Sequence, residues 1–123
     1  MKNLVGNKYL IIQSNEASNT LSVTWKGVDV SDAEYRQILK GLLSLIPKKE
    51  FTALHLDLSK LNQYIAPENQ AWTLKEWIPN LRKLSIKNLR VDIPRKTLGQ
   101  ISIKSIYGDL TNDGLQIHFL NSN

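Results

Sequence analysis

Apolar and polar residues alternate one by one in several short stretches of the chain. Leu-His-Leu-Asp-Leu at 54–58 and Leu-Arg-Val-Asp-Ile at 89–93 are the clearest examples. Successive side chains of a strand point to opposite faces of its sheet, so each stretch predicts a strand with one apolar and one polar face. The pattern predicts strands over 9–13, 21–25, 51–58, 89–93 and 115–120, with the polar residues 14–19 as the loop of a hairpin between the first two.

Three segments between the strands carry apolar residues at helical spacing instead. A capping-box pattern, Ser-Asp-Ala-Glu at 31–34, begins the first helix, and Pro47 ends it. Pro67 suits the first turn of the second helix. Pro79 lies inside that helix, where it should kink or divide it. A shorter helix is expected over residues 98–107.

The order of these elements, β-β-α-β-α-β-α-β, predicts an α/β fold. Strands that alternate with helices pair in parallel through right-handed crossovers, while the first two strands form an antiparallel hairpin. Asn112-Asp113-Gly114 predicts the turn before the last strand. Parallel strands covered on both sides are normally apolar throughout, whereas these have a polar face. We therefore expect a two-layer mixed sheet of about five strands with its helices mainly on one face. The open face would carry Ser22, Thr24, His55, Asp57, Arg90, Asp92, Gln116 and His118.

Length and residue types bound the kind of protein. With 123 residues, 41% of them hydrophobic, the chain has the size of one domain, and we expect a single domain over residues 1–123. The chain has no cysteine, which excludes disulfides, iron–sulfur clusters, thiolate zinc sites and a cysteine nucleophile. No apolar run has the ~18 residues of a membrane span, and the first residues lack the apolar stretch of a signal peptide. We therefore expect a cytoplasmic protein.

The excess of positive charge lies in one segment. The 16 basic and 11 acidic residues give a net charge of +5, and residues 82–96 alone contain six basic side chains and one acidic one. Basic segments bind nucleic acids, but no aromatic residues interleave with this one and no nucleic-acid-binding motif accompanies it. Its cations are also divided among a helix end, two loops and a strand. Nucleic acid is therefore not an expected partner.

Five short segments of the chain resemble parts of one protein family. They are Val23-Thr24-Trp25-Lys26-Gly27, Leu56-Asp57-Leu58-Ser59, Ala66-Pro67-Glu68-Asn69-Gln70-Ala71-Trp72, Glu76-Trp77-Ile78-Pro79 and Gly99-Gln100-Ile101-Ser102. The second resembles the Asp-Leu-Ser motif of STAS domains, the family of the SpoIIAA-like anti-sigma-factor antagonists, which share a fold with SEC14 lipid-binding domains. Together, the segments resemble an uncharacterised bacterial branch of this STAS/SEC14-like family.

The resemblance implies a SpoIIAA-like sheet and a regulatory or protein-interaction role. In antagonist-type STAS domains, a serine at the start of the helix after the Asp-Leu-Ser strand is phosphorylated. The corresponding place in this chain falls near Ala66-Pro67, and neither residue can accept a phosphate. Ser59 lies in a different part of the loop. We therefore expect no phosphorylation switch of that kind, and lipid exchange is not expected because the chain lacks the extra helices that would enclose a lipid.

The carboxyl ends of the predicted parallel strands form the first candidate site. Open α/β sheets bind ligands at this edge, and Asp57, Ser59, Arg95 and Lys96 are expected to gather there beside the N-termini of two helices. Cations and helix amides favour an anion such as phosphate or a carboxylate. The chain has no Gly-rich phosphate loop, and in the other interpretation these residues form a solvated loop that aids solubility.

A cluster of titratable residues on the open face is the second candidate: His55, Asp57, Arg90, Asp92 and His118. Two imidazoles and two carboxylates suit a divalent metal, and a His–Asp pair can move protons. In the other interpretation, these side chains pair across the strands as ordinary surface charges. His55 and His118 lie on strands separated by a third, about 10 Å apart at ~4.8 Å per strand. We therefore expect no metal, no cofactor and no catalytic residue, and His55, Arg90 and His118 are candidate interface residues.

Trp72 is a further candidate interface residue. It lies five residues before Trp77, so on a helix the two side chains point about 140° apart, and Trp77 belongs to the apolar stripe. Trp72 either caps the core or contacts a partner. The sequence thus favours a non-enzymatic interaction or regulatory module with a protein partner, which includes a second copy of the chain in a homodimer. The alternative is a domain that binds a small anion or an apolar ligand in the strand-end crevice.

Overall fold

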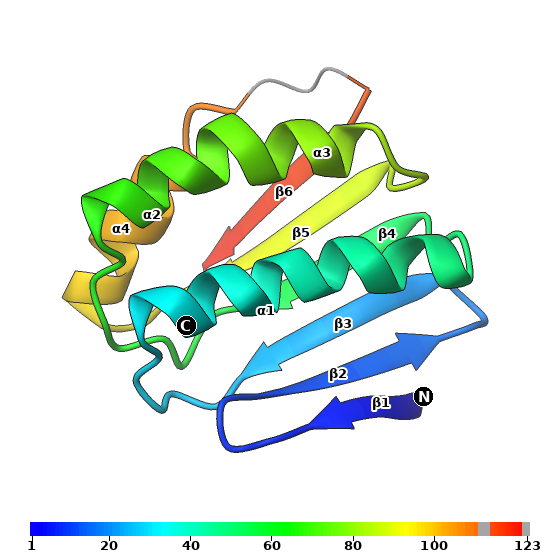
Figure 1. Cartoon of the computed structure of the whole chain (residues 1–123), viewed down its shortest axis with the longest axis horizontal. Helices are drawn as coiled ribbons and strands as arrows, with labels where there is room; N and C mark the ends of the chain where they lie inside the picture. The colour runs from blue at the N-terminus through cyan, green and yellow to red at the C-terminus, as the bar shows by residue number, and fades with distance from the viewer. Residues whose placement is uncertain (111–113, 122–123) are drawn as a thin grey trace.

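The alternating segments form a six-stranded sheet in the described part of the chain, residues 1–110 and 114–121 of a computed structural model (Figure 1). The strands are β1 (Lys2–Gly6), β2 (Leu10–Asn15), β3 (Thr20–Trp25), β4 (Ala53–Asp57), β5 (Asn88–Ile93) and β6 (Gln116–Asn121). They follow one another across the sheet in chain order. The pairs β1–β2 and β2–β3 are antiparallel, and the remaining three pairs are parallel. Apart from Gly114, the predicted turn at Asn112-Asp113-Gly114 lies outside the described residues.

β1 is the strand that the sequence pattern does not predict, so the expected hairpin is the second half of a three-stranded antiparallel meander. Its residues, Lys-Asn-Leu-Val-Gly, do not alternate between apolar and polar. A bulge between Asn3 and Val5 also shifts its register against β2, and a bulge moves the following side chains to the other face. β1 therefore forms by pairing with the edge of β2, which supplies its backbone hydrogen-bond partners.

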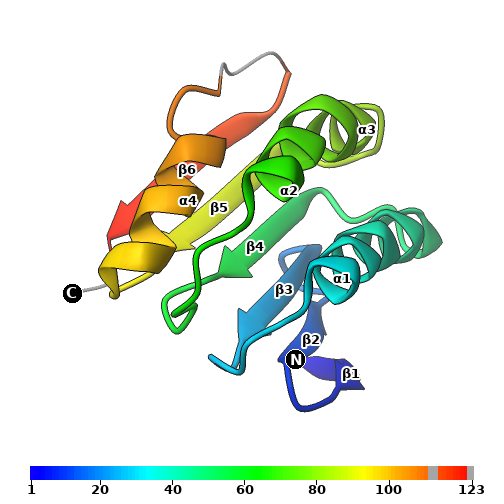
Figure 2. The same ribbon diagram turned by 60° about the vertical axis from the view of Figure 1, so that its left-hand side comes forward.

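All the helices of the described residues pack on one face of the sheet (Figure 2). They are α1 (Asp32–Leu45), the 3-10 turn η1 (Ile46–Lys48), α2 (Pro67–Trp72), the π-helical turn η2 (Thr73–Trp77), α3 (Ile78–Arg82) and α4 (Thr97–Tyr107). Each crossover advances to the next strand in the same direction, and right-handed connections of that kind leave every helix on the same side. The predicted two-layer α/β fold is thereby confirmed. Across the described residues, every helix is too short or too polar to span a lipid bilayer.

The apolar side chains of the strands lie under the helices. Those that are fully buried in the centre of the sheet are Leu21, Val23, Leu54, Leu56, Leu89 and Val91. They belong to one continuous cluster of buried residues, which also contains Trp77 and Ile103 from the helices. Full burial of a side chain of this size contributes about 1.5–3 kcal/mol. The one-residue alternation therefore decides which face of the sheet the helices cover.

The helices begin and change geometry close to the capping and proline residues that the sequence indicated. At the start of α1, the Ser31 hydroxyl accepts a hydrogen bond from the Glu34 amide (3.2 Å) and the Glu34 carboxylate accepts one from the Ser31 amide (3.3 Å), the predicted capping box. Pro79 does not break the second helix. It has no N–H to donate to the Lys75 carbonyl, and the chain widens into the π-helical turn η2 just before it, so that α2, η2 and α3 follow one another without a gap.

Candidate functional site

The loops that follow β3, β4 and β5 meet at the carboxyl ends of the strands and surround an open pocket of about 280 Å³. Its lining residues are Lys26, Gly27, Ser59, Lys60, Asn62, Arg95 and Lys96. Figure 2 shows the three loops along one edge of the sheet, together with the first turn of α4. We call this cavity the strand-end pocket. Its position is the edge at which open α/β sheets bind ligands.

Close backbone contacts hold the three loops together. The Arg95 amide donates to the Ser59 carbonyl (3.2 Å), which joins the loop after β5 to the loop after β4. Gly27 has a φ of +89°, and a Cβ there would lie 2.9 Å from the Lys60 carbonyl oxygen. A Cβ at Gly99, in the first turn of α4, would overlap the Leu61 carbonyl oxygen. Both glycines therefore permit an approach that a side chain would prevent.

The strand-end pocket is basic. Lys26, Lys60, Arg95 and Lys96 come to it from three different loops, and none of the described residues that line it is acidic. All four side chains are exposed, and the Lys26 ammonium group donates a hydrogen bond to the Asn7 carbonyl (2.6 Å). Lys96 is also the N-cap residue of α4, and no side chain caps that helix. The uncapped first amides add partial positive charge to that of the four cations.

Three of the four residues predicted for this edge line the pocket. Ser59, Arg95 and Lys96 do so, whereas the Asp57 carboxylate accepts a hydrogen bond from the Ser59 amide (3.1 Å) and shapes the loop. The residues that the sequence did not indicate are Lys26, Gly27, Lys60 and Asn62. Lys26 directly follows β3 and Lys60 is the third residue after β4. Their closeness to a strand end is the feature of the sequence that could have indicated them.

The charged residues of the open face mostly compensate one another. Asp92 accepts hydrogen bonds from Arg90 Nε and interacts with His55 Nε2, both at 3.0 Å. Burial of Asp92 raises its pKa, but the hydrogen bonds and charges of Arg90 and His55 outweigh this effect and hold the pKa below its ordinary value. His118 lies across β5 from His55 and faces Asn88 instead (3.4 Å). In residues 1–110 and 114–121, no three His, Asp or Glu side chains converge as a metal site would require.

The Trp72 ring packs against two residues of α1. The ring meets Tyr35 edge to face, with centroids 6.5 Å apart, and the Arg36 guanidinium lies 5.4 Å from its centroid. Arg36 is fixed in turn by a hydrogen bond from its Nε to the Asn69 side chain (2.5 Å). Trp72 is half-buried and joins α2 to α1, which fits the capping interpretation of this residue.

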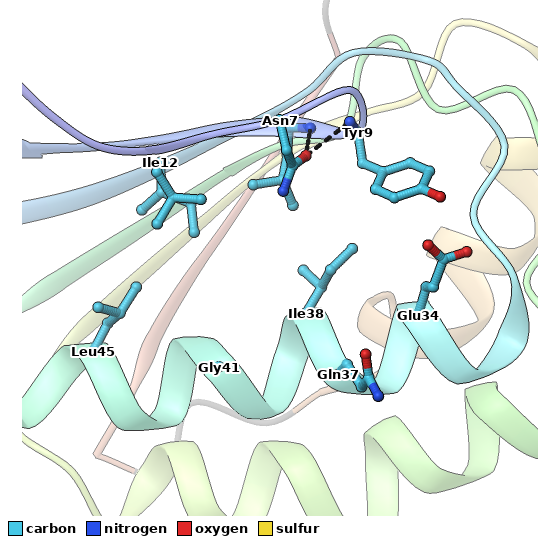
Figure 3. A pocket seen from close by; sticks show the side chains of 10 residues that line it. Asn7, Tyr9, Ile12, Glu34, Gln37, Ile38, Gly41 and Leu45 are labelled. Carbon is cyan, nitrogen blue, oxygen red and sulfur yellow. Dashed lines mark hydrogen bonds between the residues drawn. The ribbon is translucent and has the colours of Figure 1, made fainter.

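A second cavity, of about 400 Å³, lies between α1 and the β1–β2 edge of the sheet (Figure 3). Ile12, Ile38 and Leu45 line its apolar part, and Gly41 leaves space between the last two. The polar groups at its other end already form hydrogen bonds within the chain, because Asn7 Oδ1 accepts hydrogen bonds from the amides of Tyr9 (2.8 Å) and Leu10 (3.1 Å). Hydrogen bonds from Tyr9 and Ser31 likewise lower the pKa of the Glu34 carboxyl at this end. The strand-end pocket is therefore the better candidate for a charged ligand.

Comparison of the chain with models of known protein families, with curated proteins and with solved structures found no match. The resemblance to the STAS/SEC14-like family accordingly stays a prediction.

Proposed function

We propose that the protein is a non-enzymatic binding module that holds a phosphate group in the strand-end pocket. The observation that carries the proposal is the convergence of four cations from three loops on a pocket with no acidic residue among its described lining. A phosphate group has a charge of about −1.5 to −2 at pH 7, so it matches several cations better than a carboxylate does. The Ser59 hydroxyl and the Asn62 amide add neutral hydrogen-bond donors to the same pocket.

Binding in this pocket is expected to be electrostatic and sensitive to salt. The cations are exposed, and ions of opposite sign at 4 Å in water attract by about 1 kcal/mol, which corresponds to about a five-fold change in affinity. Loss of one cation should therefore weaken binding several-fold without affecting the fold. Screening at high ionic strength should weaken it further.

The experiment is a titration of the ¹⁵N-labelled protein with inorganic phosphate at constant ionic strength, followed by amide chemical shifts. We expect saturable shifts in the loops after β3, β4 and β5 and in the first turn of α4. Lys96→Ala should weaken binding about five-fold. Lys104→Ala removes an exposed cation from the last turn of the same helix and should leave the affinity unchanged. Absence of saturation, equal shifts with chloride, or equal losses in the two variants would contradict the proposal.

The second candidate function is the one that the sequence favoured, an interaction or regulatory module with a protein partner or a second copy of the chain. The exposed side chains of Leu98 and Ile101, one turn apart on α4, support it, since exposed apolar neighbours favour interfaces. Sedimentation velocity over a wide range of protein concentration tests the homodimer. A constant monomer mass would remove the second copy from consideration.

A further inference from the structure

Exposed apolar side chains lie next to residues that line the strand-end pocket. Val28 follows Gly27, Tyr64 is the second residue after Asn62, and Leu98 is the second residue after Lys96. They are 44%, 44% and 57% exposed. We call these three residues the apolar rim. They are far apart in the sequence, and the parallel pairing of β3, β4 and β5 brings the loops beside them to one edge of the sheet.

This combination of groups is unusual for a surface that only meets water. Single exposed apolar residues are ordinary, but three of them at one edge, beside four cations, form a surface with two properties. The cations Lys26, Lys60, Arg95 and Lys96 attract anions, and the apolar rim loses contact with water only when an apolar phase covers it. A free phosphate ion would satisfy the first property and leave the second unused.

We infer that this edge of the molecule docks on an anionic lipid bilayer, with a lipid phosphate in the strand-end pocket and the apolar rim inserted between the headgroups. The inference rests on the proposed function, since it names the source of the phosphate group. The charge of the pocket suits such a surface, because anionic headgroups attract each nearby Lys or Arg with about 1 kcal/mol. Apolar side chains beside basic ones also lie at the interfacial depth in proteins that bind membranes peripherally.

The arrangement of the chain supports a membrane surface over a deep lipid-binding cavity. The pocket is open, and each rim residue lies within two residues of one that lines it, so a flat surface that covers the pocket also lies near the rim. The basic residues are mostly lysines, whose flexible ammonium groups follow headgroups that have no fixed geometry.

The experiment is co-sedimentation of the full chain with two kinds of vesicle, pure phosphatidylcholine and phosphatidylcholine with about 30% phosphatidylserine. We expect at least ten-fold stronger binding to the anionic vesicles. The double variant Val28→Ser, Leu98→Ser should lose at least ten-fold of this binding while it keeps the inorganic phosphate titration of the natural chain, which also shows that it is folded. Leu74→Ser, an exposed apolar residue of η2 away from this edge, is the matched control and should bind as the natural chain does.

Three results separate this inference from the proposed function. If the chain binds inorganic phosphate but does not sediment with anionic vesicles, the inference fails and the proposed function stands. If the chain binds a phosphorylated peptide in place of vesicles, the pocket serves a protein partner and the inference also fails. If the double variant sediments like the natural chain, the apolar rim plays no part in docking, and the inference is overturned. Failure of both the phosphate and the vesicle experiments would remove both.

Discussion

Asp57 and Asp92 are cross-strand partners on the open face, and each carboxylate forms hydrogen bonds with different groups. The register of β4 and β5 places the two carboxylates opposite each other, where like charges repel. Asp57 turns toward the Ser59 amide, while Asp92 binds Arg90 and His55. The alternation of residues predicted that both would lie on this face. It did not predict their partners, because those depend on the register between strands.

Substitution of Asp92 by Asn should destabilise the protein in a pH-dependent way. The pKa of Asp92 is lower in the folded state than its ordinary value, so its charged form contributes stability above about pH 4 and loses it as the pH falls through the folded-state pKa. We expect Asp92→Asn to cost about 1–2 kcal/mol at pH 7 and much less near pH 3. Urea unfolding at both pH values measures this, with Asp109→Asn as the control at an exposed position. A pH-independent difference would contradict the role given to the ionised carboxylate.

Gly41 offers a stabilising substitution. It lies inside α1, and a Cβ added there would meet nothing within 4 Å. Glycine within a helix costs about 1 kcal/mol relative to alanine. Gly41→Ala should therefore raise the free energy of unfolding by about 1 kcal/mol, measured by urea unfolding. An unchanged or lowered stability would contradict this expectation.

At the scale of whole elements, local signals predicted the helices better than the strands at the sheet edge. The capping box and the apolar spacing of α1 act within a few residues, and both are present in the structure. β1 has no such signal, because its hydrogen bonds are made with β2. The effect of Pro79 shows a similar limit. A missing N–H and a bulky ring predict a disturbed helix, but they do not predict that it takes the form of a π-helical turn with contacts to α1.

Those contacts involve two buried side chains of η2. Thr73 Oγ1 forms a hydrogen bond with the Tyr35 hydroxyl (2.6 Å) and donates to the Asn69 carbonyl (2.7 Å), while Trp77 Nε1 donates to the Leu39 carbonyl (2.7 Å). A π-helical turn inserts one residue into the helix, which changes the direction of the side chains beyond it. Thr73 and Trp77 are four residues apart, so they share the helix face that packs on α1, and burial raises the pKa of Tyr35 to about 12.

The N-terminal cap of α1 allows a direct test at the element scale. Replacement of Ser31 by Ala removes the acceptor for the Glu34 amide, and loss of such a cap costs about 1 kcal/mol. We expect this loss in urea unfolding, whereas Ser31→Asp should retain most of the stability because its carboxylate can accept the same hydrogen bond. Equal losses in the two variants would show that the cap contributes little.

At the scale of the whole molecule, the sheet brings residues that are distant in the sequence close together in space. Lys26 and Lys60 come from parts of the sequence without excess charge, yet they line the same pocket as Arg95 and Lys96. Four of the 16 basic residues of the chain therefore gather at one end of the sheet. Four like charges there repel one another when no anion is bound.

An anion in the pocket should stabilise the whole fold. A ligand that binds only the folded state at about ten times its dissociation constant adds about 1.4 kcal/mol of stability. We expect inorganic phosphate to raise the Tm of the natural chain by a few degrees relative to sodium chloride at equal ionic strength. In Arg95→Ala the gain should be smaller at the same phosphate concentration. A gain of equal size in both proteins would locate the stabilising ion outside the strand-end pocket.

The sequence by itself determined the period of each predicted element, the buried face of each predicted strand and the side of the sheet that the helices cover. These follow from side-chain direction within one strand and from the handedness of crossovers, both of which are local rules. It also indicated Ser59, Arg95 and Lys96 at the strand ends. The tertiary structure alone decided that Lys26 and Lys60 join them, that β1 extends the sheet, and that Asp92 binds Arg90 and His55. The physical reason is that parallel pairing aligns strand ends in space whatever their separation along the chain, and a residue-by-residue pattern contains no information about register.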